Sequence, residues 1–250
     1  MTNFLNTARN EAKRIVAELP APAFYDDCDS EVEFSRKLFF QHPVLARLQE
    51  DALNFLYDET RFGIIHAKNV AIDACAIVLV EGQLASADEN RHLALLAQIS
   101  GMLHDISLHE EEPSIQNSEA AAVVLRQYDL TDRDRKLIDL AISHHEWGDF
   151  SFEDDYEAEL LCGAVHDADK FRWGPDIFST AFWKGCNYQQ ADSAQMIKCF
   201  EQSFGTISDY RDNFKTICGR SYGSELLEFG ENAGTAILEY MKRLAAVQLD

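Results

Sequence analysis

The sequence lacks paired cysteines. Its six cysteines, at positions 28, 75, 162, 186, 199 and 218, are scattered and include no Cys-x-x-Cys pair. This disfavours both a disulfide-stapled secreted domain and a cysteine zinc cluster. We expect reduced thiols in a cytoplasmic protein.

Long apolar runs are also missing. The longest, "ACAIVLV" at 74–80, is much shorter than the ~20 residues that a membrane-spanning helix needs. Residues 1–16 lack the apolar core of a signal peptide. The sequence therefore predicts no association with a membrane.

Positive charge is scarce. Lys and Arg together number 22 against 43 Asp and Glu, which gives a formal net charge of −21. Such a surface repels nucleic acid polymers and anionic membranes. An anionic small substrate needs a metal ion or local Lys and Arg side chains to offset this charge.

Alternating strand patterns are rare, and the 5 prolines and 12 glycines gather at breaks between helical segments. With 250 residues and 46% hydrophobic content, the chain can bury a core. We predict a single all-α domain, with N- and C-terminal helices packed on a central bundle. The periodicity predicts helices over 3–18, 31–41, 43–57, 64–82, 88–104, 115–128, 131–145, 155–170 and 224–247, a loop over 20–31, and Thr131 as an N-cap.

Apolar residues recur at helical spacing from residue 190 onward, and we interpret them as core residues rather than a cofactor site. They are Ile197, Phe200, Phe204, Ile207, Tyr210 and Phe214. The sequence leaves open whether this C-terminal segment covers a pocket or forms a dimer surface.

The stretch "GMLHDISLHE" at 101–110 places an imidazole beside a carboxylate at the end of an apolar helix. Histidine with carboxylate is a ligand mixture for Mn, Fe, Co, Ni or Zn. Neighbouring residues point about 100° apart on a regular helix, but a helix end can direct both to one ion. Such a pair needs partners from other helices, and the sequence offers His66, Asp167 and Asp169.

The ordered segments "HAKNVAIDA", "LLAQISGMLHDI", "IDLAISHHE" and "AVHDADKFRWG" together resemble the HD superfamily of metal-dependent phosphohydrolases. The resemblance covers roughly residues 58–180. It implies an HD-domain helical bundle over that range, with a helical extension over 181–250.

The resemblance implies a ligand set and several neighbouring roles. The metal ligands are His66, His104, Asp105 and Asp169; Asp169 is preferred to Asp167 because it immediately precedes Lys170. Asp167 then orients a ligand, Asp105 also orients the attacking water, and Lys170 and Arg172 grip phosphate. Proton transfer falls to His144 or His145, with His109 and Glu110 as further candidates.

Three positions depart from the family pattern. Asn117 stands where members with two metals carry another His, which favours one divalent ion and places Asn117 beside the site. Leu108 replaces a Lys that is typical of cyclic-dinucleotide enzymes, and Phe171-Arg172 replaces a Leu-Asp of nucleotide-acting members. The ion itself stays open among Mn, Fe, Co, Ni, Zn and Mg.

The function expected from the resemblance is hydrolysis of a nucleotide or another small phosphoester or phosphoanhydride through a metal-activated water. Two alternatives stay open. One is a di-iron oxygenase on the same scaffold, and the other is a metal-binding or ligand-sensing domain without turnover. The expected partner in the first case is a small phosphorylated substrate.

Overall fold

The structure is a computed structural model that describes residues 2–53, 55–56, 63–107, 113–146, 148 and 150–247. Within these ranges it consists of helices and their connections, without a strand. The prediction of an all-α fold is confirmed. The α-helices are α1 (Thr2–Glu18), α2 (Ala23–Asp27), α3 (Asp29–Gln41), α4 (Pro43–Ala52), α5 (Gly63–Glu81), α6 (Ala87–Leu103), α7 (Pro113–Leu125), α8 (Asp132–His144), α9 (Tyr156–Phe171), α10 (Phe182–Tyr188), α11 (Ser193–Gly205) and α12 (Ile217–Val247).

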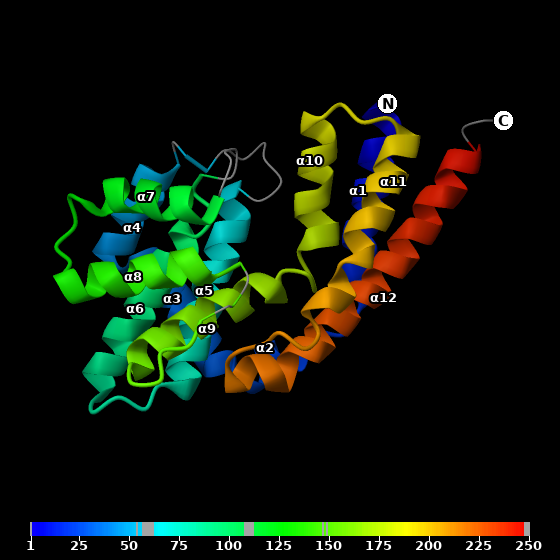
Figure 1. Cartoon of the computed structure of the whole chain (residues 1–250). Helices are drawn as coiled ribbons and strands as arrows, with labels where there is room; N and C mark the ends of the chain where they lie inside the picture. The colour runs from blue at the N-terminus through cyan, green and yellow to red at the C-terminus, as the bar shows by residue number, and fades with distance from the viewer. Residues whose placement is uncertain are drawn as a thin grey trace.

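Helix α5 lies at the centre of a bundle that also contains α3, α4 and α6–α9 (Figure 1). It packs against α3, α6 and α9, while α8 closes the bundle against α6, α7 and α9. Most of α5 is buried, including Val70, Ala74 and Ile77. An apolar helix that is buried on nearly all sides is typical of a domain core.

The apolar character of α5 exceeds what the run at 74–80 indicated. The helix Gly63–Glu81 is long and apolar enough to cross a membrane by those two measures, and 67% of its most apolar window is buried inside the protein. Because it also carries the buried polar side chains of His66 and Asp73, we interpret it as the core helix of the bundle.

Helices α1, α10, α11 and α12 form a second layer beside the bundle (Figure 1). Helix α12 begins near α2, α5 and α9 and then runs alongside α1 and α11. It begins at Ile217, earlier than the predicted start at 224, so one continuous helix joins the bundle to the second layer.

Three segments differ from the predicted secondary structure. The region 20–31 is not a loop, because it contains α2 and the start of α3. Phe24 makes this possible by packing edge-on against the rings of Phe171 and Tyr222. A π-helical turn at Ile177–Ala181 followed by α10 was also not predicted. The predicted helix 43–57 ends at Ala52, and part of its remainder lies outside the described residues.

The N-cap of α8 is confirmed. The Thr131 hydroxyl accepts a hydrogen bond from the Asp134 amide, and the Asp134 carboxylate accepts one from the Thr131 amide. This capping box satisfies two amides that would otherwise have no helical partner. It fixes the start of the helix that ends at His144 and His145.

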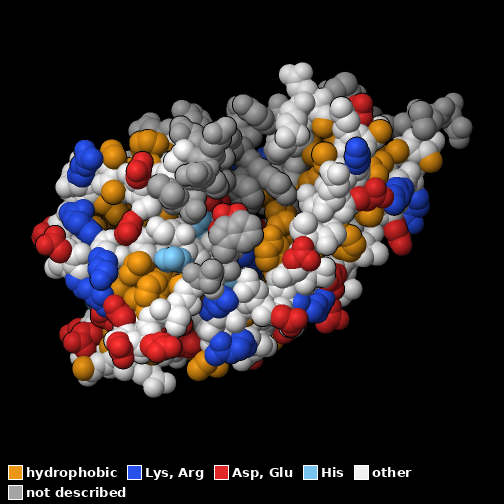
Figure 2. Space-filling model, viewed as in Figure 1, with side chains coloured by type: hydrophobic (Ala, Val, Ile, Leu, Met, Phe, Trp, Pro, Cys, Tyr) orange, Lys and Arg blue, Asp and Glu red, His pale blue; other side chains and the backbone are white. Residues whose placement is uncertain are grey.

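The excess of acidic residues is spread over the surface. In Figure 2, Asp and Glu side chains occur over both parts of the visible face, with Lys and Arg between them. All six cysteines lie in the part of the chain that the structure describes, and none of them forms a disulfide bond.

Candidate metal centre

Three helices bring four predicted ligands together. His66 comes from α5, His104 and Asp105 follow the end of α6, and Asp169 lies near the end of α9. The Nε2 atoms of His66 and His104 are 3.1 Å apart. Asp169 Oδ1 lies 3.2 Å from His66 Nε2 and 3.7 Å from His104 Nε2. Asp105 Oδ2 lies 3.4 Å from His104 Nε2 and 3.9 Å from His66 Nε2.

A glycine permits this close approach of α5 and α6. A Cβ atom on Gly101 would lie 2.7 Å from the Cα of Ala71 and 2.8 Å from its amide nitrogen. Because backbone atoms cannot give way as a flexible side chain can, any larger residue would push the two helices apart. The Gly101 carbonyl also accepts a hydrogen bond from His104 Nδ1 at 2.7 Å.

Backbone carbonyls determine the orientation of two imidazoles. A carbonyl oxygen can only accept, so Nδ1 carries the hydrogen in His104, which donates to Gly101, and in His145, which donates to Ile142 at 2.7 Å. In the neutral rings, Nε2 then presents a lone pair. Those lone pairs point at carboxylate oxygens, an arrangement that needs a shared positive charge to be stable.

The carboxylates favour a cation at this point. Burial alone lowers the pKa of His104, but Asp105 and Asp169 together raise it to about 10. Burial alone raises the pKa of Asp105, which His104 and His145 more than offset, so the group ionises below its usual range. The charges of the cluster therefore suit a proton or a metal ion at this point.

The donor set fits a divalent metal ion. The ligand atoms of His66, His104 and Asp105 all lie within 4.8 Å of one another, and the three residues are buried or nearly so. Bonds of about 2.1 Å place neighbouring ligand atoms roughly 3.0–3.4 Å apart, close to several distances in the cluster. Two imidazoles and two carboxylates favour a borderline first-row ion.

The two adjacent histidines at the end of α8 have different surroundings. His145 is buried and its Nε2 lies 3.3 Å from Asp105 Oδ1, the oxygen that does not approach His104. His144 instead packs against the rings of Phe150 and Phe152. The structure thus places His145, and not His144, beside the predicted ligands; His109 and Glu110 lie outside the described residues.

The two basic residues that follow Asp169, Lys170 and Arg172, have different surroundings. Lys170 is buried with its Nζ 2.8 Å from Asp169 Oδ2, and it lines the pocket beside the predicted ligands. Arg172 differs from the prediction, because its terminal nitrogens pair with Asp73, Asp176 and the Tyr25 hydroxyl. Its guanidinium links α2, α5 and the turn after α9, although the residue also lines the pocket beside the predicted ligands.

Asp167 does not take the predicted role of orienting a ligand. Its carboxylate accepts hydrogen bonds from the amides of Lys215 and Thr216 and from the Thr216 hydroxyl, at distances of 2.7–3.1 Å. It therefore anchors the start of α12. Gly219 lies so close to this carboxylate that a Cβ atom would clash with it.

Asn117 lies beside the site, as predicted. Its Oδ1 accepts a hydrogen bond of 2.6 Å from the amide of Ser107, two residues after Asp105. Its Nδ2 is buried without a hydrogen-bond partner among the described residues. Asn117 thus holds the turn that carries Asp105 and leaves one donor available to a ligand.

A pocket of about 170 Å³ opens onto the cluster. Besides the predicted site residues, it is lined by Glu146, Trp173, Ile177 and Tyr210, to which the sequence assigned no role at the site. Tyr210 belongs to the apolar pattern interpreted as core. Lys170 Nζ lies 5.3 Å from the centroid of the Tyr210 ring, and the sequence gives no signal for this contact.

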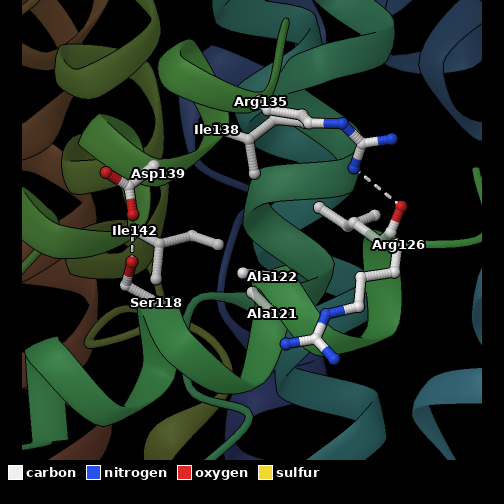
Figure 3. A pocket seen from close by; sticks show the side chains of 9 residues that line it. Ser118, Ala121, Ala122, Arg126, Arg135, Ile138, Asp139 and Ile142 are labelled. Atoms are coloured by element: carbon white, nitrogen blue, oxygen red, sulfur yellow. Dashed lines mark hydrogen bonds between the residues drawn. The ribbon is translucent and has the colours of Figure 1, made fainter. Parts of the chain in front are cut away.

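A separate cavity of about 420 Å³ lies between α7 and α8 (Figure 3). Its walls include the apolar side chains of Ala121, Leu125 and Ile138. The guanidinium of Arg135 donates to the backbone carbonyl of Leu125, and Ser118 pairs with Asp139 across the other end. None of the predicted metal ligands lines this cavity.

No family model, curated protein or solved structure matches this chain.

Proposed function

We propose that this protein is a metal-dependent phosphohydrolase of the HD type that acts on a small phosphoester or phosphoanhydride. The observation that carries the proposal is the buried cluster of His66, His104, Asp105 and Asp169 at the floor of a pocket that also contains Lys170. Free thiols and the burial of α5 support a soluble, cytoplasmic enzyme.

The four ligand residues would hold one divalent ion. Bound there, the ion supplies positive charge to a phosphate oxygen and acidifies a coordinated water. The reaction joins the water oxygen to phosphorus and breaks the bond from phosphorus to the leaving oxygen, which takes up a proton.

Two side chains can hold the phosphate in place. Lys170 supplies a buried positive charge next to Asp169, and the net charge of −21 makes such a local cation necessary. Asn117 Nδ2 supplies a hydrogen-bond donor at the pocket wall. Together they offer a positive charge and a donor to the phosphate oxygens.

His145 is the group best placed to move a proton. Its Nδ1 is held by the Ile142 carbonyl, so its Nε2 is the atom that faces the pocket and Asp105. Asp105 stabilises the protonated ring through its Oδ1. We therefore assign proton transfer to His145.

The test is phosphate release by protein loaded with Mn²⁺, Co²⁺, Ni²⁺ or Mg²⁺. Nucleoside mono-, di- and triphosphates, cyclic nucleotides and generic phosphoesters serve as substrates, with metal content measured in parallel. We expect metal-dependent turnover that the Asp105→Ala variant loses together with its metal.

Absence of turnover in protein that retains its metal would contradict the proposal. Oxygen uptake by the iron-loaded protein would then identify an oxygenase, and ligand binding without either reaction would identify a sensor.

A further inference from the structure

A second cavity, called the chamber below, adjoins the pocket at the proposed metal ligands, which we call the metal pocket. The chamber has a volume of about 520 Å³, is open to solvent on one side, and is bordered by α10, α11 and the segments that contain Trp173 and Tyr210. Its lining includes Trp173, Phe182, Gln189, Cys199, Gln202 and Tyr210. It belongs to the C-terminal part of the chain, to which the sequence assigned no chemistry.

Two aromatic side chains belong to both cavities. Trp173 and Tyr210 line the metal pocket as well as the chamber. Their ring centroids are 5.2 Å apart with the planes inclined by 31°. Lys170 Nζ contacts the Tyr210 ring from the side of the metal ligands. A molecule held near Lys170 therefore lies next to the chamber.

The volumes of the two cavities indicate which part of a substrate each one can hold. The metal pocket, at about 170 Å³, is smaller than the ~300–1,000 Å³ of usual small-molecule sites, whereas the chamber falls within that range. A third cavity, which touches the metal pocket at His66 and Arg172, offers only about 10 Å³. The chamber is thus the neighbouring space that can receive the organic part of a phosphate ester.

The lining indicates what that organic part is. Among the described residues, no Lys, Arg, Asp or Glu lines the chamber, although the chain as a whole is strongly charged. Aromatic faces at Trp173 and Tyr210 favour a flat ring. The side-chain amides of Gln189 and Gln202, exposed and without a hydrogen-bond partner among the described residues, offer donors and acceptors to the edge of such a ring.

We propose that the chamber formed by Trp173, Tyr210, α10 and α11 binds an uncharged heteroaromatic ring of the substrate while its phosphate lies at the metal cluster. The position of the phosphate at the metal ligands rests on the proposed function. The binding of the ring rests on the chamber alone, so an experiment can contradict either one without the other.

Cys199 provides a readout that does not depend on turnover. It lines the chamber and is partly exposed, whereas the other five cysteines are buried. Burial also raises the pKa of Cys75 and Cys162 to about 12, which suppresses their reactivity. Iodoacetamide should therefore modify Cys199 first, and peptide mass spectrometry measures the rate at that residue.

The experiment compares three probes on the metal-loaded protein. These are adenosine monophosphate, adenosine without phosphate, and ribose 5-phosphate without a ring. We expect the first two to slow labelling of Cys199 and the third to leave it unchanged. We also expect kcat/KM for phosphate release to be roughly 10- to 100-fold higher for adenosine monophosphate than for ribose 5-phosphate.

Two variants and a control test the lining directly. Trp173→Leu should weaken protection by adenosine roughly 10-fold or more. Gln202→Ala, which changes an exposed side chain and leaves folding unaffected, should weaken it several-fold. Lys198→Ala, on the same helix but outside the chamber lining, should leave it unchanged.

The outcomes separate the two proposals. Protection by adenosine without phosphate release from any substrate would overturn the proposed function and uphold the ring site. Equal turnover of both phosphates, with no protection of Cys199 by adenosine, would uphold the hydrolase and overturn the ring site.

Discussion

His144 and His145 are adjacent in the sequence, yet only one faces the metal cluster. His145 Nε2 lies 3.3 Å from Asp105, while His144 contacts Phe150 and Phe152. We expect His145→Ala to lower kcat by about 10²–10⁴-fold because a positioned proton-transfer group is lost. His144→Ala is the matched control and should keep most of the activity. Equal losses in both variants would show that the assignment of His145 is wrong.

The buried guanidinium of Arg172 predicts a stability effect. It pairs with Asp73 and Asp176, and Asp73 is itself buried. Removing Asp73 leaves the buried guanidinium with Asp176 as its remaining carboxylate partner. Asp73→Ala should therefore lower the free energy of unfolding by about 3 kcal/mol, the low end for a broken buried ion pair. Urea denaturation measures this change. The exposed pair Lys37–Glu33 supplies the control, because Glu33→Ala should leave the urea midpoint unchanged.

Roles of site residues could be predicted from the sequence where neighbouring residues in the chain determine them. The pair His104-Asp105 at the end of an apolar helix indicated a metal site. The resemblance to the HD superfamily then supplied the full ligand set, whose members the structure brings together. The roles of Asp167 and Arg172 were not predictable, because their partners Thr216 and Asp73 are distant in the chain. A single sequence contains no signal for such pairings.

The contact between α5 and α6 positions the cluster, and it depends on Gly101. An added methyl group would meet the backbone of Ala71. Gly101→Ala should therefore destabilise the protein by about 1–3 kcal/mol and weaken metal binding, since it moves His104 away from His66. Denaturation and metal titration measure the two effects.

The control for Gly101 is another helical glycine. A Cβ atom on Gly205, the last residue of α11, would meet nothing within 4 Å. Gly205→Ala should be neutral or mildly stabilising. If Gly101→Ala were tolerated as well as Gly205→Ala, close packing of α5 on α6 would not be what holds His66 and His104 together.

Helix starts and periodic faces were the most predictable elements. Thr131 caps α8 as expected, and the starts of α4 and α5 agree with the sequence pattern to within one residue. The short helix α2 and the π-helical turn before α10 were missed. Both form through tertiary contacts, such as the packing of Phe24 on Phe171, and short segments carry little periodicity of their own.

At the scale of the whole molecule, the second layer of helices completes the pocket that the bundle begins. Tyr210 comes from the segment between α11 and α12, and Trp173 from the turn after α9. Sequence periodicity identified the apolar face of the C-terminal segment. It could not indicate that Tyr210 on that face borders a cavity, because burial in a core and contact with a pocket select the same aromatic residues.

The four proposed metal ligands come from segments that are far apart in the chain, so metal binding should stabilise the whole fold. His66 lies in α5, His104 directly follows α6 and Asp169 lies in α9, and only the native state holds them together. At 100 times its Kd, an ion bound only by the native state adds about 2.7 kcal/mol, which corresponds to roughly 5–10 °C in Tm for a chain of this size.

Thermal unfolding monitored by circular dichroism measures the shift after treatment with a chelator and after reloading with Mn²⁺. Asp169→Ala should lose the shift, because the ligand at 3.2 Å from His66 is gone. Asp139→Ala, an exposed aspartate of α8, should keep it. An equal shift in Asp169→Ala would mean that Mn²⁺ binds elsewhere, for example at surface carboxylates, since a cluster that has lost one of its two carboxylates has a weaker attraction for a divalent cation.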